Sequence, residues 1–295
     1  MADTPPPGVG PSGPDQSPLY HAQHSDRYER QALIQEYQRG YECRLVVVFD
    51  AIFPYSLNFF EDLVYDADPA QALHLLLATP GGDGESALRL VRSAQARCRE
   101  MVVIVPDLAK SAGTLIALGA HRILMGPTSD LGPVDPQFSL NPQNPQELSS
   151  AKDLIAAVDQ AVESVQKSPD TYALHAALLA PVNALMVQQA RSALARTGDL
   201  ALEALQANPA RTAAQAKELW ETKLCKPLME ESRSHAATFG VDAAIATGLP
   251  VEKVDPSGPQ WELIWRLWMK YFVRNERIYE GERASHALGL WQQPG

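Results

Sequence analysis

Apolar and polar residues follow two alternating patterns along the chain from residue 43 onwards. Short, nearly continuous apolar runs, which are typical of buried strands, occupy 44–50, 73–78, 101–106 and 122–126. The segments between them place apolar residues at helical spacing, over 56–67, 85–98 and a stretch that begins at Ser111. Buried strands that alternate with helices require crossover connections. The pattern therefore predicts an α/β fold with a mainly parallel sheet.

The pattern becomes predominantly helical after residue 146. Residues 149–166 predict a helix with Ser149 or Ser150 as its N-cap. One face of this helix carries Leu154, Val158, Val162 and Val165. An Ala-, Leu- and Gln-rich helical part covers about 171–221, and 241–254 returns briefly to an α/β pattern. We therefore expect a helical C-terminal part after the strand-rich half.

A further helix is predicted at 261–274, and its apolar face is unusually wide. Its charged positions form one i, i+4 row: Glu262, Arg266, Lys270 and Arg274. Its apolar positions include Trp261, Trp265, Trp268, Tyr271 and Phe272. Such a face needs cover, either from the protein's own body or from a neighbouring subunit. The alternative is peripheral contact with a membrane interface through 261–273, where Trp and Tyr are favoured.

The first residues have a composition that does not support a hydrophobic core. Six prolines and three glycines precede Leu19, which predicts a disordered Pro/Gly-rich tail over 1–25. A folded domain follows at 26–255, and a Trp-rich C-terminal helix and tail at 256–295. The chain opens without a signal-peptide pattern, and no apolar run approaches the roughly 20 residues of a membrane span. We therefore expect a soluble, cytoplasmic protein.

Composition narrows the class of protein further. The chain has 295 residues, of which 45% are hydrophobic, as in globular proteins. Its 25 basic and 35 acidic residues give a net charge of −10, which argues against a nucleic-acid surface. Three scattered cysteines are too few for a disulfide framework or a zinc site and fit a reducing compartment.

Two loops follow neighbouring predicted strands, TPGGDG at 79–84 and DLAKSAG at 107–113. In parallel sheets, functional groups gather beyond the carboxyl ends of the strands. Ser111 starts a helix, where the dipole and the unpaired N–H groups favour negative charge. The backbone amides of Gly81, Gly82 and Ala112 would then form an oxyanion hole beside a serine nucleophile. The residues alone leave this open, because serine is also a common N-cap and Gly-Gly a common turn.

Longer stretches around these loops resemble the serine dehydrogenase proteinase family, a group of Clp-type and signal-peptide-peptidase-type serine proteases. The resemblance rests on LATPGGDGESALRLVRSA (77–94), VPDLAKSAGTLIALGAHRILMGPTSDLGPVDPQ (105–137) and FGVDAAIATGLPVEKV (239–254). It covers about 43–255. It implies a Clp/crotonase-like fold, in which ββα units form a spiral of mainly parallel sheet. It also implies peptide-bond hydrolysis through an acyl-enzyme on Ser111, in a homo-oligomer.

The resemblance leaves the general base to be chosen between two arrangements. Clp-type peptidases carry a histidine some two dozen residues after the serine, where this chain has GPVDPQF (132–138) and no histidine. His121 comes too early and at the far end of the helix. Signal-peptide-peptidase-type relatives use a Ser–Lys dyad, and Lys152 falls in the window for that lysine. A desolvated lysine near a helix N-terminus has a lowered pKa. The helical wheel also allows Lys152 to be a solvated surface residue.

Other titratable residues have weaker claims on this site. Lys110 is adjacent to the serine and should project elsewhere. His235 is a candidate base, although a lone histidine is commonly structural. Asp83 and Asp130 could orient a base, although loop carboxylates are commonly solvated.

We therefore predict a serine peptidase with Ser111 as nucleophile and Lys152 as base. It would need no metal or organic cofactor and would take peptide or protein substrates. One alternative is a non-catalytic oligomeric scaffold with the same fold. The other is an acyl-CoA thioester enzyme, for which a helix-start serine is a poor match. The sequence does not identify the substrate, the subunit number or a partner that delivers substrate.

Overall fold

A computed structural model describes residues 17–139, 148–231 and 237–291. Its centre is a seven-stranded sheet with the order β10-β5-β3-β2-β1-β11-β12. Five of its strands run parallel: β1 (Cys43–Phe49), β2 (Ala72–Ala78), β3 (Glu100–Val105), β5 (Arg122–Met125) and β10 (Val251–Lys253). The predicted α/β fold with a mainly parallel sheet is therefore confirmed.

Helices cover both faces of this sheet. One face packs against α3 (Ser56–Val64), α4 (Gly84–Ala96), α5 (Ala112–Leu118) and α8 (Ala184–Ala207). The other face packs against α2 (Ser25–Tyr41) and α11 (Pro259–Arg274). Side chains of β2 alternate between the two cores, since Leu75 and Leu77 join the first and Leu76 joins the second. Burial on both faces explains why the strands are continuous apolar runs.

A smaller sheet, which the hydrophobic pattern did not predict, lies at the carboxyl end of the large one. It contains β4 (Leu108–Ala109), β6 (Asp130–Leu131) and β9 (Phe239–Gly240). A separate hairpin pairs β7 (Gln137–Ser139) with β8 (Leu148–Ser150). Strands of two or three residues are too short to produce a recognisable period.

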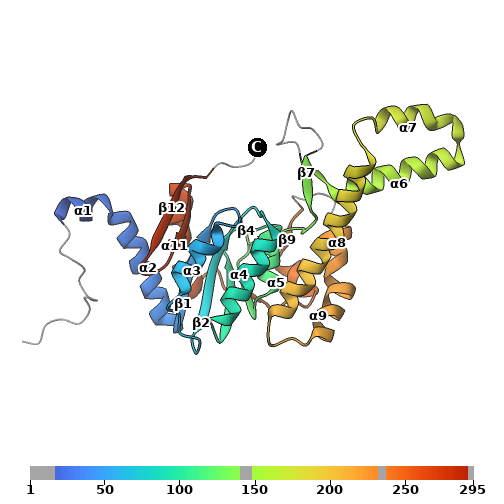
Figure 1. Ribbon diagram of the computed structural model, residues 1–295. Helices are drawn as coiled ribbons and strands as arrows, with labels where there is room; N and C mark the ends of the chain where they lie inside the picture. Colours follow the sequence, from blue (N-terminus) through green and yellow to red (C-terminus); the bar gives the residue numbers. More distant parts are fainter. Residues whose placement is uncertain (1–16, 140–147, 232–236, 292–295) are drawn as a thin grey trace, which may run out of the picture.

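Two helices project from the body together with the first turns of α8 (Figure 1). They are α6 (Ala151–Lys167) and α7 (Tyr172–Leu178), which are joined by the 3-10 turn Pro169–Thr171. The face predicted for α6 is only partly covered. Leu154 is buried against Ala190 of α8, whereas Val162 is 52% exposed. We call α6, α7 and the 3-10 turn between them the arm.

The remaining helical elements follow α8 and complete the body. They are α9 (Ala213–Leu219), the π-helical turns Trp220–Leu224 and Lys226–Glu230, and α10 (Val241–Ala246). None of the helices in the described part of the chain has both the length and the hydropathy needed to cross a membrane.

Both ends of the chain differ from the expectation. Residues Pro18–Gln23 form helix α1 within the range predicted to be disordered, because Ser17 caps its N-terminus by accepting a hydrogen bond from the Tyr20 N–H, with Pro18 in the first turn. Residues 1–16 lie outside the described residues. The expected C-terminal tail instead contains β11 (Glu276–Glu280) and β12 (Ser285–Leu290), which extend the sheet antiparallel from β1. β11 pairs with β1, which is distant in sequence, and β12 pairs in turn with β11.

The wide apolar face of α11 is covered mainly by the protein's own body. Trp261, Trp268 and Tyr271 are buried in the second core. The basic row pairs with acidic residues of α2: Arg266 with Glu36, Lys270 with Glu29 and Arg274 with Asp26. Membrane contact through 261–273 stays a prediction.

Candidate active site

The two predicted loops meet at the carboxyl ends of β2 and β3. The Thr79 N–H donates to the Leu108 carbonyl at 3.0 Å, and the Lys110 N–H donates to the Thr79 carbonyl at 3.0 Å. A Cβ added to Gly81 would lie 2.8 Å from the Cβ of Ser111. Gly81 also has a φ of 122°, which side chains rarely allow. Only glycine therefore permits this close approach to the serine.

Ser111 has an unusual backbone conformation, with φ 49° and ψ −109°. This region is unfavourable for a residue with a Cβ and costs roughly 1–3 kcal/mol. The side chain is half-buried and does not cap α5. Within residues 17–139, 148–231 and 237–291, its hydroxyl makes no hydrogen bond. Ser111 therefore occupies the N-cap position of α5 without a capping bond from its side chain, and the hydroxyl is free within the described residues.

Two backbone amides beside this serine are unbonded within the described residues. Around Gly82, the Ile52 N–H donates to the Gly81 carbonyl at 2.8 Å and the Asp83 N–H donates to the Ile52 carbonyl at 2.7 Å. In such a parallel bridge the N–H of Gly82 points away from Ile52. The N–H of Ala112 has no acceptor because it lies in the first turn of α5.

The third predicted donor, the amide of Gly81, is not available. Its N–H donates to the Thr79 hydroxyl at 3.1 Å. The structure therefore corrects the predicted oxyanion hole and leaves Gly82 and Ala112 as its candidate donors. A Cβ on Gly82 would lie 2.1 Å from the Ile52 carbonyl oxygen, so this position also requires glycine.

Several of the other candidates have structural partners that keep them from the serine. Lys110 pairs with Asp130 and also donates to the carbonyls of Leu131 (3.3 Å) and Ala237 (3.2 Å), so it projects elsewhere as expected. Asp83 caps α4, because it accepts from the Glu85 N–H at 3.1 Å and from the Ser86 hydroxyl at 2.7 Å.

The structure places only one of the two histidine candidates, His121, and it lies away from the serine. His121 accepts a hydrogen bond from the Met101 N–H at 3.1 Å, beyond the opposite end of α5. Burial lowers the pKa of His121. His235 lies outside the described residues.

Lys152 lies at the start of α6 and is less solvated than a surface lysine. Its side chain is 14% exposed, and Nζ lies 3.0 Å from Oδ1 of Asp153. The Ala151 N–H donates to the Pro136 carbonyl at 2.9 Å, which ties this helix start to the segment that follows β6. No hydrogen bond joins Lys152 to Ser111 in the described part of the chain. Among the residues that the structure describes, none is therefore placed as a base on the serine hydroxyl.

A buried hydrogen-bonded cluster around a single carboxyl group supports the glycine loop, and the sequence analysis missed it. Asp50 is fully buried at the end of β1 and accepts hydrogen bonds from the Ala51 N–H (2.8 Å), Tyr55 (3.1 Å) and Tyr279 (3.3 Å). Burial raises the pKa of this carboxyl group. The cluster fixes the chain just before Ile52. A charged residue directly after a buried strand was the available signal.

Comparison with known proteins places this site in a class. Residues 65–164, which contain both loops and Ser111, match the family model of the ClpP-like SDH-type serine proteinases. The matched segment is therefore similar to a serine-proteinase family with a ClpP-like fold. More particularly, the resemblance to the serine dehydrogenase proteinases is confirmed over these residues.

Curated relatives match short segments of the chain. The uncharacterized protein MJ0137 of Methanocaldococcus jannaschii is 40% identical over 88 residues, which are 30% of this chain and 28% of the relative. The membrane-bound protease PH1510 of Pyrococcus horikoshii is 36% identical over 76 residues, 25% of this chain and 17% of the relative. The matches thus span less than a third of either relative.

Solved structures align more widely but at low similarity. A serine-to-alanine mutant of the 1510-N membrane-bound stomatin-specific protease aligns over 79% of this chain and 84% of that chain, with 18% identity and a TM-score of 0.41. A peptidase from Plasmodium falciparum aligns over 76% of this chain and 98% of that chain, with 10% identity and a TM-score of 0.39.

Proposed function

We propose that this protein is a serine peptidase in which Ser111 is the nucleophile. One observation carries the proposal: a strained serine with a free hydroxyl lies against Gly81, beside the unbonded amides of Gly82 and Ala112. Serine must be exposed and adjacent to preorganised N–H donors in order to form an acyl-enzyme. The strained turn keeps the hydroxyl out of the N-cap bond that it would otherwise make.

The reaction would proceed in two stages, acylation of Ser111 and hydrolysis of the resulting ester. The Ser111 oxygen attacks the scissile carbonyl carbon, its proton passes to a base, and the N–H groups of Gly82 and Ala112 bind the oxyanion. The C–N bond then breaks, the amine leaves with the proton, and an ester on Ser111 remains. Water hydrolyses this ester and releases the acid, which restores the serine hydroxyl.

We propose Lys152 as the base, with its low exposure as the support. The side chain of Lys152 is only 14% exposed, so few waters solvate its ammonium group. Its partner Asp153 is 64% exposed, and an ion pair with so exposed a carboxylate contributes only about 0–1 kcal/mol. Turning Nζ from Asp153 toward the serine therefore costs little. The proposal requires this hydrogen bond in the substrate complex.

A fluorophosphonate probe tests the nucleophile and the base separately. The wild-type protein should label, and Ser111→Ala should not. Lys152→Ala should label about 10²–10⁴ times more slowly, the usual contribution of a general base. The neighbouring variant Asp153→Asn is the matched control and should label at nearly the wild-type rate. Labelling of Ser111→Ala, or an unchanged rate in Lys152→Ala, would contradict the respective assignment.

A non-catalytic scaffold is the second candidate function, and one observation favours it. No described side chain hydrogen-bonds to the Ser111 hydroxyl, so the site lacks a visible base. A scaffold would assemble yet fail to label with the probe, and it would not cleave an unfolded protein such as casein.

Self-assembly is proposed from the surface of the arm and of the α8 start. Exposed apolar side chains gather there: Tyr172 and Leu178 at 66%, Leu174 at 60% and Leu185 at 66%. Contiguous apolar exposure of this kind marks interaction surfaces. Light scattering should show a smaller particle for Leu174→Ser combined with Leu178→Ser. The control is Val273→Ser on α11, which is 80% exposed and lies outside the arm.

A further inference from the structure

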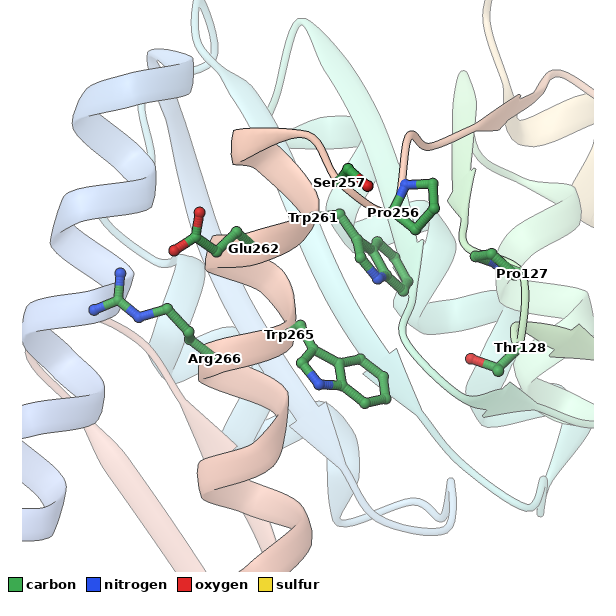
Figure 2. A pocket seen from close by; sticks show the side chains of 8 residues that line it. All are labelled: Pro127, Thr128, Pro256, Ser257, Trp261, Glu262, Trp265 and Arg266. Atoms are coloured by element: carbon green, nitrogen blue, oxygen red, sulfur yellow. The ribbon is translucent and has the colours of Figure 1, made fainter.

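Two pockets border α11, and their linings differ in chemistry. The first, of about 480 Å³, has aromatic walls, and Figure 2 shows the indoles of Trp261 and Trp265 facing the turn at Pro127. In the same view Glu262 and Arg266 extend away from the indoles, toward α2. The second, of about 540 Å³, lies at the amino ends of the parallel strands and is lined mainly by charged and polar side chains. The second pocket is therefore the better match for a charged ligand.

The charged residues of this second pocket follow the order of the strands. Glu42 directly precedes β1 and Asp68 lies in the turn before β2, whereas Arg99 and Arg122 stand at the starts of β3 and β5. Because the strand order is β5-β3-β2-β1, Glu42 and Asp68 lie toward one end of the pocket and the arginines toward the other. Adjacent strands are about 4.8 Å apart, so Glu42 and Arg99, two strands apart, are separated by about 10 Å. We call this cavity the amino-end pocket.

Three of these charges have no counterion in the part of the chain that the structure describes. Arg122 is neutralised, because its Nε donates to Glu100 at 2.6 Å and its Nη1 to Glu252 at 3.2 Å. Glu42, Asp68 and Arg99, by contrast, form no ion pair with any described residue. The pocket therefore offers two free carboxylates at one end and a free guanidinium group at the other.

His74 supplies an uncharged donor between these two ends. It lies in β2, is only 4% exposed and lines the pocket. Gln260 donates to the Tyr37 hydroxyl at 3.1 Å, and that hydroxyl in turn donates to Nδ1 of His74 at 2.9 Å. Burial lowers the pKa of His74, so the ring is neutral and carries its proton on Nε2. This N–H has no acceptor among the described residues, and a ligand carbonyl would satisfy it.

We propose that the amino-end pocket binds a short peptide with both termini free. The peptide's ammonium group pairs with Glu42 and Asp68, and its carboxylate pairs with Arg99. A peptide carbonyl between them accepts the hydrogen bond from His74. An extended peptide spans about 3.4 Å per residue, so three residues match the distance of about 10 Å across the pocket. A single amino acid is too short to reach both ends, and an inorganic anion would leave both carboxylates unpaired.

This site is separate from the candidate active site. The pocket lies at the amino ends of β2 and β3, whereas Ser111 lies beyond their carboxyl ends. Strand β2 has seven residues, so the two sites are about 20 Å apart. Peptides with free termini are also the products of the proposed peptidase, but the binding argument does not rest on that activity.

Isothermal titration calorimetry with trialanine tests the proposal on the full-length chain. The titrations use Ser111→Ala, so that no hydrolysis adds heat. N-acetyl-trialanine amide, which has no charged terminus, should bind at least about tenfold more weakly than trialanine, because two ion pairs are lost. Arg99→Gln and Glu42→Gln, both at exposed positions, should each raise the Kd for trialanine about fivefold, as expected for one exposed ion pair. The matched control is Arg266→Gln, at a half-exposed arginine outside this pocket, which should leave the Kd unchanged.

Three results would overturn the inference. Equal affinity for trialanine and its capped analogue would mean that the termini are not recognised. An unchanged Kd in both Arg99→Gln and Glu42→Gln would place the peptide elsewhere, the active site included. Weaker binding in Arg99→Gln alone would indicate a site for anions only. A protein that binds trialanine as expected but does not label with a fluorophosphonate would retain this site and lose the proposed peptidase function.

Discussion

The strained conformation of Ser111 predicts a reversal of the usual order of alanine and glycine. At ordinary positions glycine is less stable than alanine by roughly 0.5–1 kcal/mol, because it loses more backbone entropy on folding. At φ 49° and ψ −109°, however, a residue with a Cβ carries a strain of about 1–3 kcal/mol that glycine does not. Ser111→Gly should therefore be more stable than Ser111→Ala by about 0.5–2 kcal/mol.

Urea denaturation followed by circular dichroism measures this difference. Neither variant should label with a fluorophosphonate, so activity cannot confuse the comparison. The control is Ala157→Gly on the exposed face of α6, which should destabilise by about 1 kcal/mol. If Ser111→Ala proved as stable as Ser111→Gly, no strain would be stored at the serine.

Three further predictions concern groups around the core. Glu280→Gln should lower the free energy of unfolding, measured in urea, by about 3–5 kcal/mol, because the charge of Arg30, which is 3% exposed, would stay buried without its partner. A loss below about 1 kcal/mol would contradict this. Burial lowers the pKa of His74 to about 4, so the folded state favours the neutral ring. Because the unfolded chain binds a proton there near pH 6.5, the free energy of unfolding should fall by about 3 kcal/mol between about pH 6.5 and 4. His74→Gln should lose less over that range, and equal losses in both proteins would refute the assignment. Thr79→Val should slow probe labelling, since the Gly81 N–H loses its acceptor, while wild-type labelling would show that this bond does not position the loop.

The sequence predicted the loops of the candidate site but not all of its chemistry. TPGGDG and DLAKSAG follow adjacent strands, and parallel pairing of β2 with β3 brings their ends together. The amide of Gly81 donates to the hydroxyl of Thr79, two residues earlier, a local turn that the sequence analysis did not consider. The burial of Asp50 depends on Tyr279, which is far away in the sequence. The first feature is local and was overlooked, whereas a contact between distant residues decides the second.

Local periodicity was sufficient for the large parallel strands and their helices, since burial on both faces leaves continuous apolar runs in the sequence. The small sheet and strand β11 have no such signal, because they pair with strands that are distant in the sequence, and β12 depends on β11 for its pairing. The strained φ of Ser111 likewise arises from how the surrounding loops are held. A sequence specifies which residues prefer the interior, whereas tertiary packing determines which remaining polar groups find partners and which stay free to react.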